Sequence, residues 1–244
     1  MKIILLVLVS LLSFQVYAQE LSKKEKRYIA PNSVFIELGS GLFYGRSLTQ
    51  TEGFNNRGAR ASWMPFVKVE LGLKKNIFTE LEITTQRYHP NIRYSNYGGA
   101  GGSSFRASKL SFGIGYRLIK SETNYNYGNL SFGASLSYQS QTGITSSGGG
   151  FQGSSSGYFE ESGYGVGVNK VFPTFYIGFD KDLRLFKTLY LSLGYKYDHG
   201  FITVHEMIGT YRTEPSGNFS PYYGKVNGSA HSYSLGLKYK FSET

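Results

Sequence analysis

Apolar residues alternate with small or polar residues along most of the chain after Ser33. In the two clearest stretches, 109–119 and 129–139, every second residue is apolar, and most of the residues between are glycine, serine or another polar type. A period of two predicts β-strands, because successive side chains of a strand point to opposite faces of its sheet. Each stretch has about the 10 residues with which a tilted strand crosses a bilayer. The eight stretches are 34–45, 63–73, 77–87, 109–119, 129–139, 171–180, 188–198 and 230–241.

Three residues fit this pattern poorly. Phe35 and Phe43 fall on the face that otherwise holds Glu37 and several glycines. Pro173 stands inside the sixth stretch, and a proline cannot donate a ladder hydrogen bond. We therefore expect a bulge or weak pairing near Pro173.

The connections between the stretches are long and short in strict alternation. The long ones run over 44–62, 88–108, 140–164 and 199–228, and the short ones over 74–76, 120–128 and 181–187. Outer-membrane barrels have long extracellular loops and short periplasmic turns, with both termini in the periplasm. The sequence therefore predicts an all-β fold, a closed antiparallel transmembrane barrel of about eight strands in an up-and-down meander. The 140–163 segment is rich in glycine and serine and is expected to be mobile.

The first residues are typical of a cleavable secretory signal. Lys2 precedes an apolar run from Ile3 to Leu12, and Val16-Tyr17-Ala18 stands before Gln19, where cleavage is expected. The apolar run is too short to span a bilayer as a helix. We expect a signal peptide at 1–18, a periplasmic tail at 19–32 and one barrel domain at 33–244, exported to the bacterial outer membrane.

Composition narrows the classes of partner and chemistry. The chain has no cysteine, so disulfides and thiolate sites are excluded, and we expect no cofactor and no metal. Its net charge of +10 could suit nucleic acid, but an exported chain without a recognition motif does not fit that partner. Anionic lipid head groups are the better counter-charge.

Charged residues of both signs share the small-residue face of the strands. We expect this face to line the barrel interior, where opposite charges can pair. A soluble lipocalin-like barrel would bury the apolar set instead, but its exposed face would not need so much glycine. The register places Glu37 beside Lys238 or Lys240 at the closing seam, and Glu80 or Glu82 beside Arg117. The predicted interior network is Glu37, Lys68, Glu70, Glu80, Glu82, Arg117, Lys196, Asp198, Lys238 and Lys240.

The last stretch reads His231-Ser-Tyr-Ser-Leu-Gly-Leu-Lys-Tyr-Lys-Phe241. With the eight stretches, it resembles the small OmpA/OmpX-like eight-stranded bacterial outer-membrane β-barrel family. The resemblance implies that Tyr239 and Phe241 belong to an insertion signal read by the barrel-assembly machinery. Because the barrel takes up nearly all of this sequence, we do not expect an OmpA-type peptidoglycan-binding domain.

Other residues suggest contacts outside the barrel. Arginines in the first two long connections could bind lipopolysaccharide phosphates through their planar forks, or simply face solvent. They are Arg46, Arg57, Arg60, Arg87, Arg93 and Arg106.

Polar residues near the long connections could also serve a lipid A-modifying enzyme. Asp198, His199, His205, Glu206 and Ser232 offer acid, base and nucleophile. However, sequence neighbours on a strand point to opposite faces. We expect no catalytic site and favour a non-enzymatic barrel with a structural, surface-contact or adhesion role that contacts outer-membrane lipid and lipopolysaccharide. A lipid A-modifying enzyme and an accessory subunit of an outer-membrane secretion or assembly complex are the alternatives.

Overall fold

The computed structural model describes most of the chain after residue 32. The described residues are 33–49, 51, 54–55, 61–74, 76–89, 92–94, 99–100, 104–119, 127–154 and 157–241. The expected signal peptide and tail at 1–32 lie outside these residues, as do Arg57, Arg60 and the side chain of Arg93. Among the described residues, no helix is long and apolar enough to cross a membrane.

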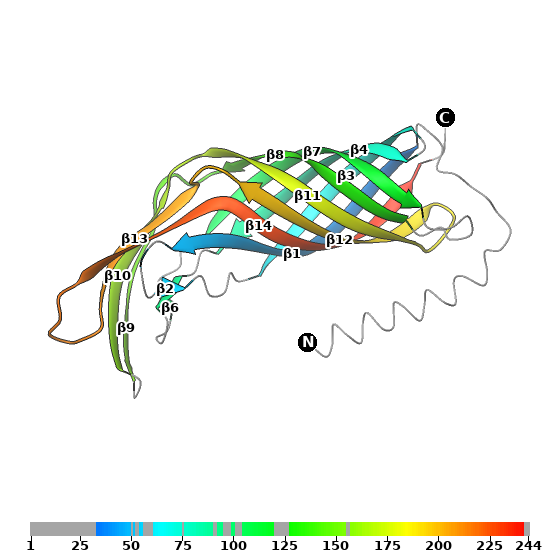
Figure 1. Ribbon diagram of the computed structural model, residues 1–244. Helices are drawn as coiled ribbons and strands as arrows, with labels where there is room; N and C mark the ends of the chain where they lie inside the picture. Colours follow the sequence, from blue (N-terminus) through cyan, green and yellow to red (C-terminus); the bar gives the residue numbers. More distant parts are fainter. Residues whose placement is uncertain are drawn as a thin grey trace.

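Eight long strands form a closed antiparallel barrel (Figure 1). Each strand pairs with its successor in this set, and the last pairs with the first along fourteen residues of register from Phe35↔Lys240 onward, with one shift after Gly45. The meander barrel predicted from the alternating pattern is confirmed. The strands are β1 (Val34–Thr49), β3 (Ser62–Lys74), β4 (Ile77–Tyr88), β7 (Phe105–Ile119), β8 (Tyr127–Gln139), β11 (Val171–Arg184), β12 (Leu189–Gly200) and β14 (Ser220–Lys240).

The two faces of these strands differ as the alternation predicts. Apolar side chains cover the outer surface, including Leu38, Ile83 and Phe132, which are about half exposed or more. The inner face is buried. Small residues on it make room for large neighbours: a Cβ atom at Gly115 would lie 2.1 Å from the ring of Phe78.

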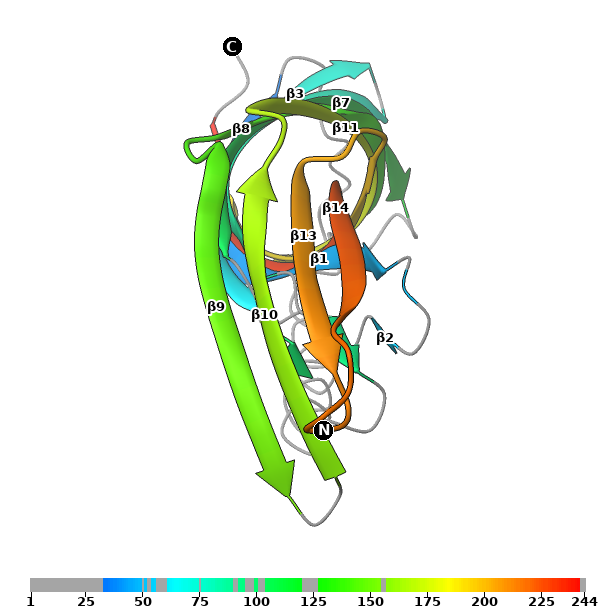
Figure 2. The same ribbon diagram turned by 90° about the vertical axis from the view of Figure 1, so that its left-hand side faces the viewer.

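Two of the long connections form an arm that continues the sheet beyond the barrel (Figures 1 and 2). The hairpin of β9 (Gly143–Ser154) and β10 (Gly157–Gly167) pairs with β13 (His205–Arg212), which pairs with the first half of β14. The glycine- and serine-rich segment expected to be a mobile loop is therefore built into strands. Backbone hydrogen bonds to β13, from a different connection, hold it in this conformation.

The other two long connections also meet. The short strands β2 (Phe54–Asn55), β5 (Ile92–Tyr94) and β6 (Gly99–Ala100) form a small separate sheet. All four long connections thus contain strands and lie at one end of the barrel, which faces the cell exterior in barrels of this kind.

Pro173 does not disturb its strand. It pairs with Leu136 in a β8–β11 register that is continuous from Val171 to Asp182, so the bulge expected there is wrong. The ladder from β11 to β12 begins only at Thr174. On that side the strand needs no amide donor at Pro173, which is the edge position that proline tolerates.

The arm leaves the barrel at a bend in β14. Gly228 has φ = +84°, a left-handed conformation that glycine adopts without strain. The bend is tied on both sides: the Tyr88 hydroxyl donates to the Gly228 carbonyl at 3.2 Å, and the Asn227 amide donates to the Gly200 carbonyl at 2.9 Å. The junction is therefore a fixed structural feature.

The bend can be tested with two glycines of similar conformation. Gly228→Ala places a Cβ atom 3.0 Å from the Phe172 ring, whereas Gly143→Ala, at φ = +81°, meets nothing within 4 Å. Both substitutions introduce backbone strain of about 1–2 kcal/mol. We expect Gly228→Ala to lower the free energy of unfolding, measured by urea titration in detergent, by more than Gly143→Ala does. Equal losses would show that crowding at Phe172 has no part in the bend.

Candidate functional site

Lys68 lies at the centre of a buried ion-pair network inside the barrel. Its Nζ atom is 2.9 Å from a carboxylate oxygen of Glu37, 2.9 Å from Asp180 and 3.5 Å from Glu70. These residues come from β1, β3 and β11, and β11 is not a neighbour of β3 in the sheet. The contact with Asp180 therefore crosses the lumen.

Lys238 forms the second centre, at the closing seam. Its Nζ atom is 2.7 Å from Glu70, 2.7 Å from Asp182 and 3.9 Å from Glu37. Glu37 and Lys238 are direct partners in the β1–β14 register, one of the two seam pairings that the sequence suggested. Lys240 is only half-buried.

The pairing expected for Arg117 is wrong. Glu80 and Glu82 stand opposite Gly113 and Ser111 in the β4–β7 register, whereas Arg117 reaches Glu70 on β3, with Nη2 3.3 Å from the carboxylate. The long guanidinium side chain bypasses its neighbouring strand. The Tyr176 hydroxyl donates to Glu80 at 2.6 Å, and Lys196 pairs with Glu82 at 2.7 Å.

The remaining expected residue, Asp198, is buried and pairs with Lys109 at 2.5 Å. Lys109, Asp180 and Asp182 are members of the network that were absent from the predicted set. Their positions on the small-residue face of their strands could have identified them as interior residues. Asn129 adds a hydrogen bond to Asp182 at 2.7 Å.

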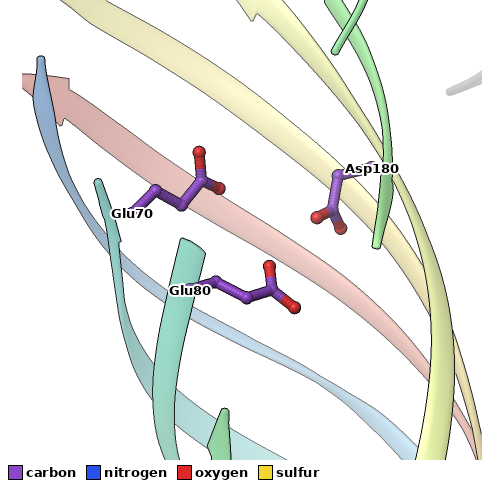
Figure 3. A group of neighbouring side chains, drawn as sticks. All are labelled: Glu70, Glu80 and Asp180. Atoms are coloured by element: carbon purple, nitrogen blue, oxygen red, sulfur yellow. The ribbon is translucent and has the colours of Figure 1, made fainter. Parts of the chain in front are cut away.

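Three acidic side chains of the network point toward one another (Figure 3). Oxygen atoms of Glu70, Glu80 and Asp180 lie within 4.8 Å of one another, a grouping that could hold a cation. The ammonium groups of Lys68 and Lys238 already contact two of the three. The chain's own cations thus supply the positive charge that such a group requires.

Next to this network, toward the arm, lies a cluster of buried apolar side chains. The ring of Tyr88 stacks on Phe105 at 4.7 Å and meets Phe43 edge-on at 4.8 Å. His205 of the arm stacks on Phe105 at 5.0 Å and is fully buried. The apolar plug consists of Phe43, Met64, Phe66, Tyr88, Phe105, Ala107, Phe172, Val204, Val226 and Ala230.

Two pairs of sequence neighbours among the polar residues considered for catalysis are split between the two faces of their strands. Asp198 lies inside the barrel, whereas His199 is exposed on the outer surface. Ser232 is buried, and its hydroxyl donates to the Lys196 carbonyl at 3.4 Å. The neighbouring His231 lies on the outer face, where its Nδ1 atom forms a hydrogen bond of 2.9 Å with the Tyr195 hydroxyl. The strand alternation that was expected to split these pairs does so.

Aromatic side chains mark both edges of the apolar outer belt. Near the arm, rings of Tyr195, His231 and Tyr197 follow one another at 6.1 and 4.9 Å. At the opposite end, Tyr239 and Phe241, the expected insertion signal, meet edge-on at 5.0 Å and are exposed. Such girdles are typical of membrane–water interfaces.

Of the arginines considered for lipopolysaccharide, Arg46, Arg87 and Arg106 are described with their side chains, and all three are exposed. They lie at the ends of β1, β4 and β7 that face the long connections. Arg93 belongs to β5 of the small sheet.

Comparisons with known proteins agree with this architecture. No protein-family model and no curated protein matches the chain. Among solved structures, the chain is similar to the outer membrane protein OprG from Pseudomonas aeruginosa, with 9% identity and a TM-score of 0.54 over 87% of this chain and 97% of that one. It is also similar to Neisserial surface protein A, with 12% identity and a TM-score of 0.48 over 85% of this chain and 97% of that one. A third similar structure is the outer membrane protease OmpT from Escherichia coli, with 11% identity and a TM-score of 0.42 over 87% of this chain and 98% of that one.

The fold and the apolar outer belt define a class. The chain has the fold of small outer-membrane β-barrels such as OprG. At these identities the similarity concerns the fold, and the neighbours differ in what they do.

The interior network can be tested at its centre. Lys68→Met leaves buried Glu37 and Asp180 without their closest cation, which typically costs about 3–5 kcal/mol. Glu37→Ala should cost less, because Lys68 keeps Asp180, and Lys240→Met at the half-buried rim should cost under about 1 kcal/mol. Heat-modifiable gel migration and urea unfolding measure this order. Equal stability of Lys68→Met and Lys240→Met would contradict the central role of Lys68.

His205 should make the arm sensitive to acid. Burial lowers the pKa of His205 to about 4, from an ordinary value of 6.5. The unfolded imidazole therefore takes up a proton first, so the stability that neutral His205 contributes is present above pH 6.5 and is lost as the pH falls toward 4. We expect protease cleavage of the arm to increase over this window. His205→Phe should remove the change, and an identical pH response in that variant would assign it to other groups.

Proposed function

We propose that this protein is a closed, non-enzymatic outer-membrane barrel that acts through its exposed surface. One observation carries the proposal: the interior is filled at two levels, by the ion-pair network and by the apolar plug. An eight-stranded barrel has room for side chains and little else. A function in bulk diffusion through the barrel is therefore disfavoured.

The arm is the surface best suited to contacts with other molecules. On one face, Arg212 pairs with Glu160 and lies over the rings of Tyr158 and Phe219, at 5.6 and 4.7 Å. A hydrogen bond from the Tyr158 hydroxyl and another from Arg212 lower the pKa of Glu160. Tyrosine and arginine are enriched where proteins bind partners. These features support a structural, surface-contact or adhesion role.

Lipid and lipopolysaccharide are the proposed partners at the base of the arm. The exposed arginines at the strand ends carry positive charge at the edge of the apolar belt, where lipid phosphates lie. During biogenesis, the barrel-assembly machinery would recognise the last strand with Tyr239 and Phe241.

Planar-bilayer recordings test closure. We expect the purified barrel to produce no steady channel openings, while a general porin added to the same bilayer does. Tyr88→Ala with Phe172→Ala cuts the apolar plug alone, and this variant should also stay closed because the network below it is intact. Discrete openings of the unmodified barrel would overturn the proposal. Openings of the variant alone would show that the plug is the only seal.

A further inference from the structure

Arg87 and Arg106 form a cross-strand pair of like charge. They are direct partners in the β4–β7 register, and both side chains are exposed on the outer surface. Side chains in such positions have Cβ atoms about 5 Å apart, and like charges there destabilise a sheet. The sequence places two guanidinium groups where each repels the other, and an anion bound between them would relieve that repulsion.

The neighbourhood provides no such anion among the described residues. Each interior cation discussed above has a carboxylate within 3.3 Å. By contrast, Arg87 donates to the neutral Ser104 hydroxyl at 2.9 Å, and no described carboxylate forms a salt bridge with either arginine. The Lys170 ammonium, 5.2 Å from the centre of the Tyr138 ring, adds a third positive charge nearby.

The position of the pair along its strands indicates where the anion would come from. On the outer face of the same ladder, Ile83 pairs with Leu110, Thr85 with Ser108, and then Arg87 with Arg106. The ladder thus passes from lipid-facing aliphatic side chains through hydroxyls to guanidinium groups within four residues. Such a change from aliphatic to charged side chains is typical of the level at which the hydrocarbon layer ends and lipid head groups begin.

Two exposed aromatic residues frame the pair. The Ser62 hydroxyl donates to the Arg87 carbonyl at 2.7 Å, which places its neighbour Trp63 beside Arg87. Trp63 is 68% exposed. On the other side, Tyr138 is the partner of Ser108, two residues from Arg106. Tryptophan and tyrosine anchor proteins at the head-group level.

We propose that Arg87 and Arg106 form a binding site for one phosphate group of an outer-leaflet phosphoglycolipid of the lipid A kind. This inference rests on the proposed surface role and specifies its ligand. A phosphate monoester carries nearly two negative charges and several acceptor oxygens, so it can bridge two planar guanidinium forks. Trp63 and Tyr138 then contact the lipid beside the phosphate.

The test measures binding of fluorescent bis-phosphorylated lipid A to the full-length barrel in detergent. We expect Arg87→Gln/Arg106→Gln to weaken binding at least tenfold. Arg184→Gln is the matched control, because Arg184 lies at the other end of the barrel, where its Nε donates to the Phe186 carbonyl at 3.1 Å. Unchanged binding by the double variant, or an equal loss in Arg184→Gln, would overturn the site.

Two further probes identify the source of the anion. Dephosphorylated lipid A should bind the unmodified barrel at least tenfold more weakly; equal binding would assign recognition to the acyl chains. Inorganic phosphate at the same concentration should not displace lipid A; displacement would assign the site to a soluble anion. Either result would overturn the lipid phosphate assignment.

The unfolding temperature should respond to the Arg106 substitution differently without lipid and with phosphorylated lipid A. In lipid-free detergent, Arg106→Gln removes the repulsion and should leave the unfolding temperature equal or higher, whereas with phosphorylated lipid A it should unfold at a lower temperature than the unmodified barrel. A lower temperature in both conditions would show a purely structural role. Conductance separates the two proposals: a closed barrel that fails to bind lipid A overturns the site alone, whereas an open one overturns the surface role.

Discussion

The ion pair between Lys68 and Asp180 is the interaction on which the interior depends. Backbone ladders join each strand only to its neighbours, whereas this pair, at 2.9 Å, joins β3 to β11 across the lumen. A buried ammonium is stable only when carboxylates surround it, and Glu37 and Glu70 complete that shell. Because these carboxylates also contact Lys238 and Arg117, the network fixes the relative positions of strands from both halves of the barrel.

Much of this architecture could be predicted from the alternation of apolar and small or polar residues, because in a closed barrel every strand has one face inside and one face outside. Phe35 and Phe43 depart from the pattern because each has a packing role inside the barrel. The Arg117 guanidinium lies 4.5 Å from the centre of the Phe35 ring, and Phe43 belongs to the apolar plug. The partner of Arg117 could not be predicted, because a long side chain can pass its adjacent strand. The β9–β10 hairpin was likewise hidden, since its order comes from pairing with β13.

The same residue type has different consequences on the two faces. Arg117, inside, is buried and must be neutralised by Glu70 in the folded chain itself. Arg87 and Arg106, outside, are exposed, so solvent and salt can screen them and the fold tolerates their proximity. The face of a strand thus decides whether a positive charge serves stability or is available for a ligand.

Closure and surface contact are linked through the arm. His205 and Val226 belong to arm strands, yet both are buried at the mouth of the barrel, where His205 stacks on Phe105 and Val226 joins the apolar plug. Movement of the arm away from the mouth would expose apolar surface to water. The hydrophobic effect therefore opposes this movement. A binding surface held in this way loses little conformational entropy when it meets a partner. The packing that closes the interior thus also holds the arm in place for the surface role proposed above.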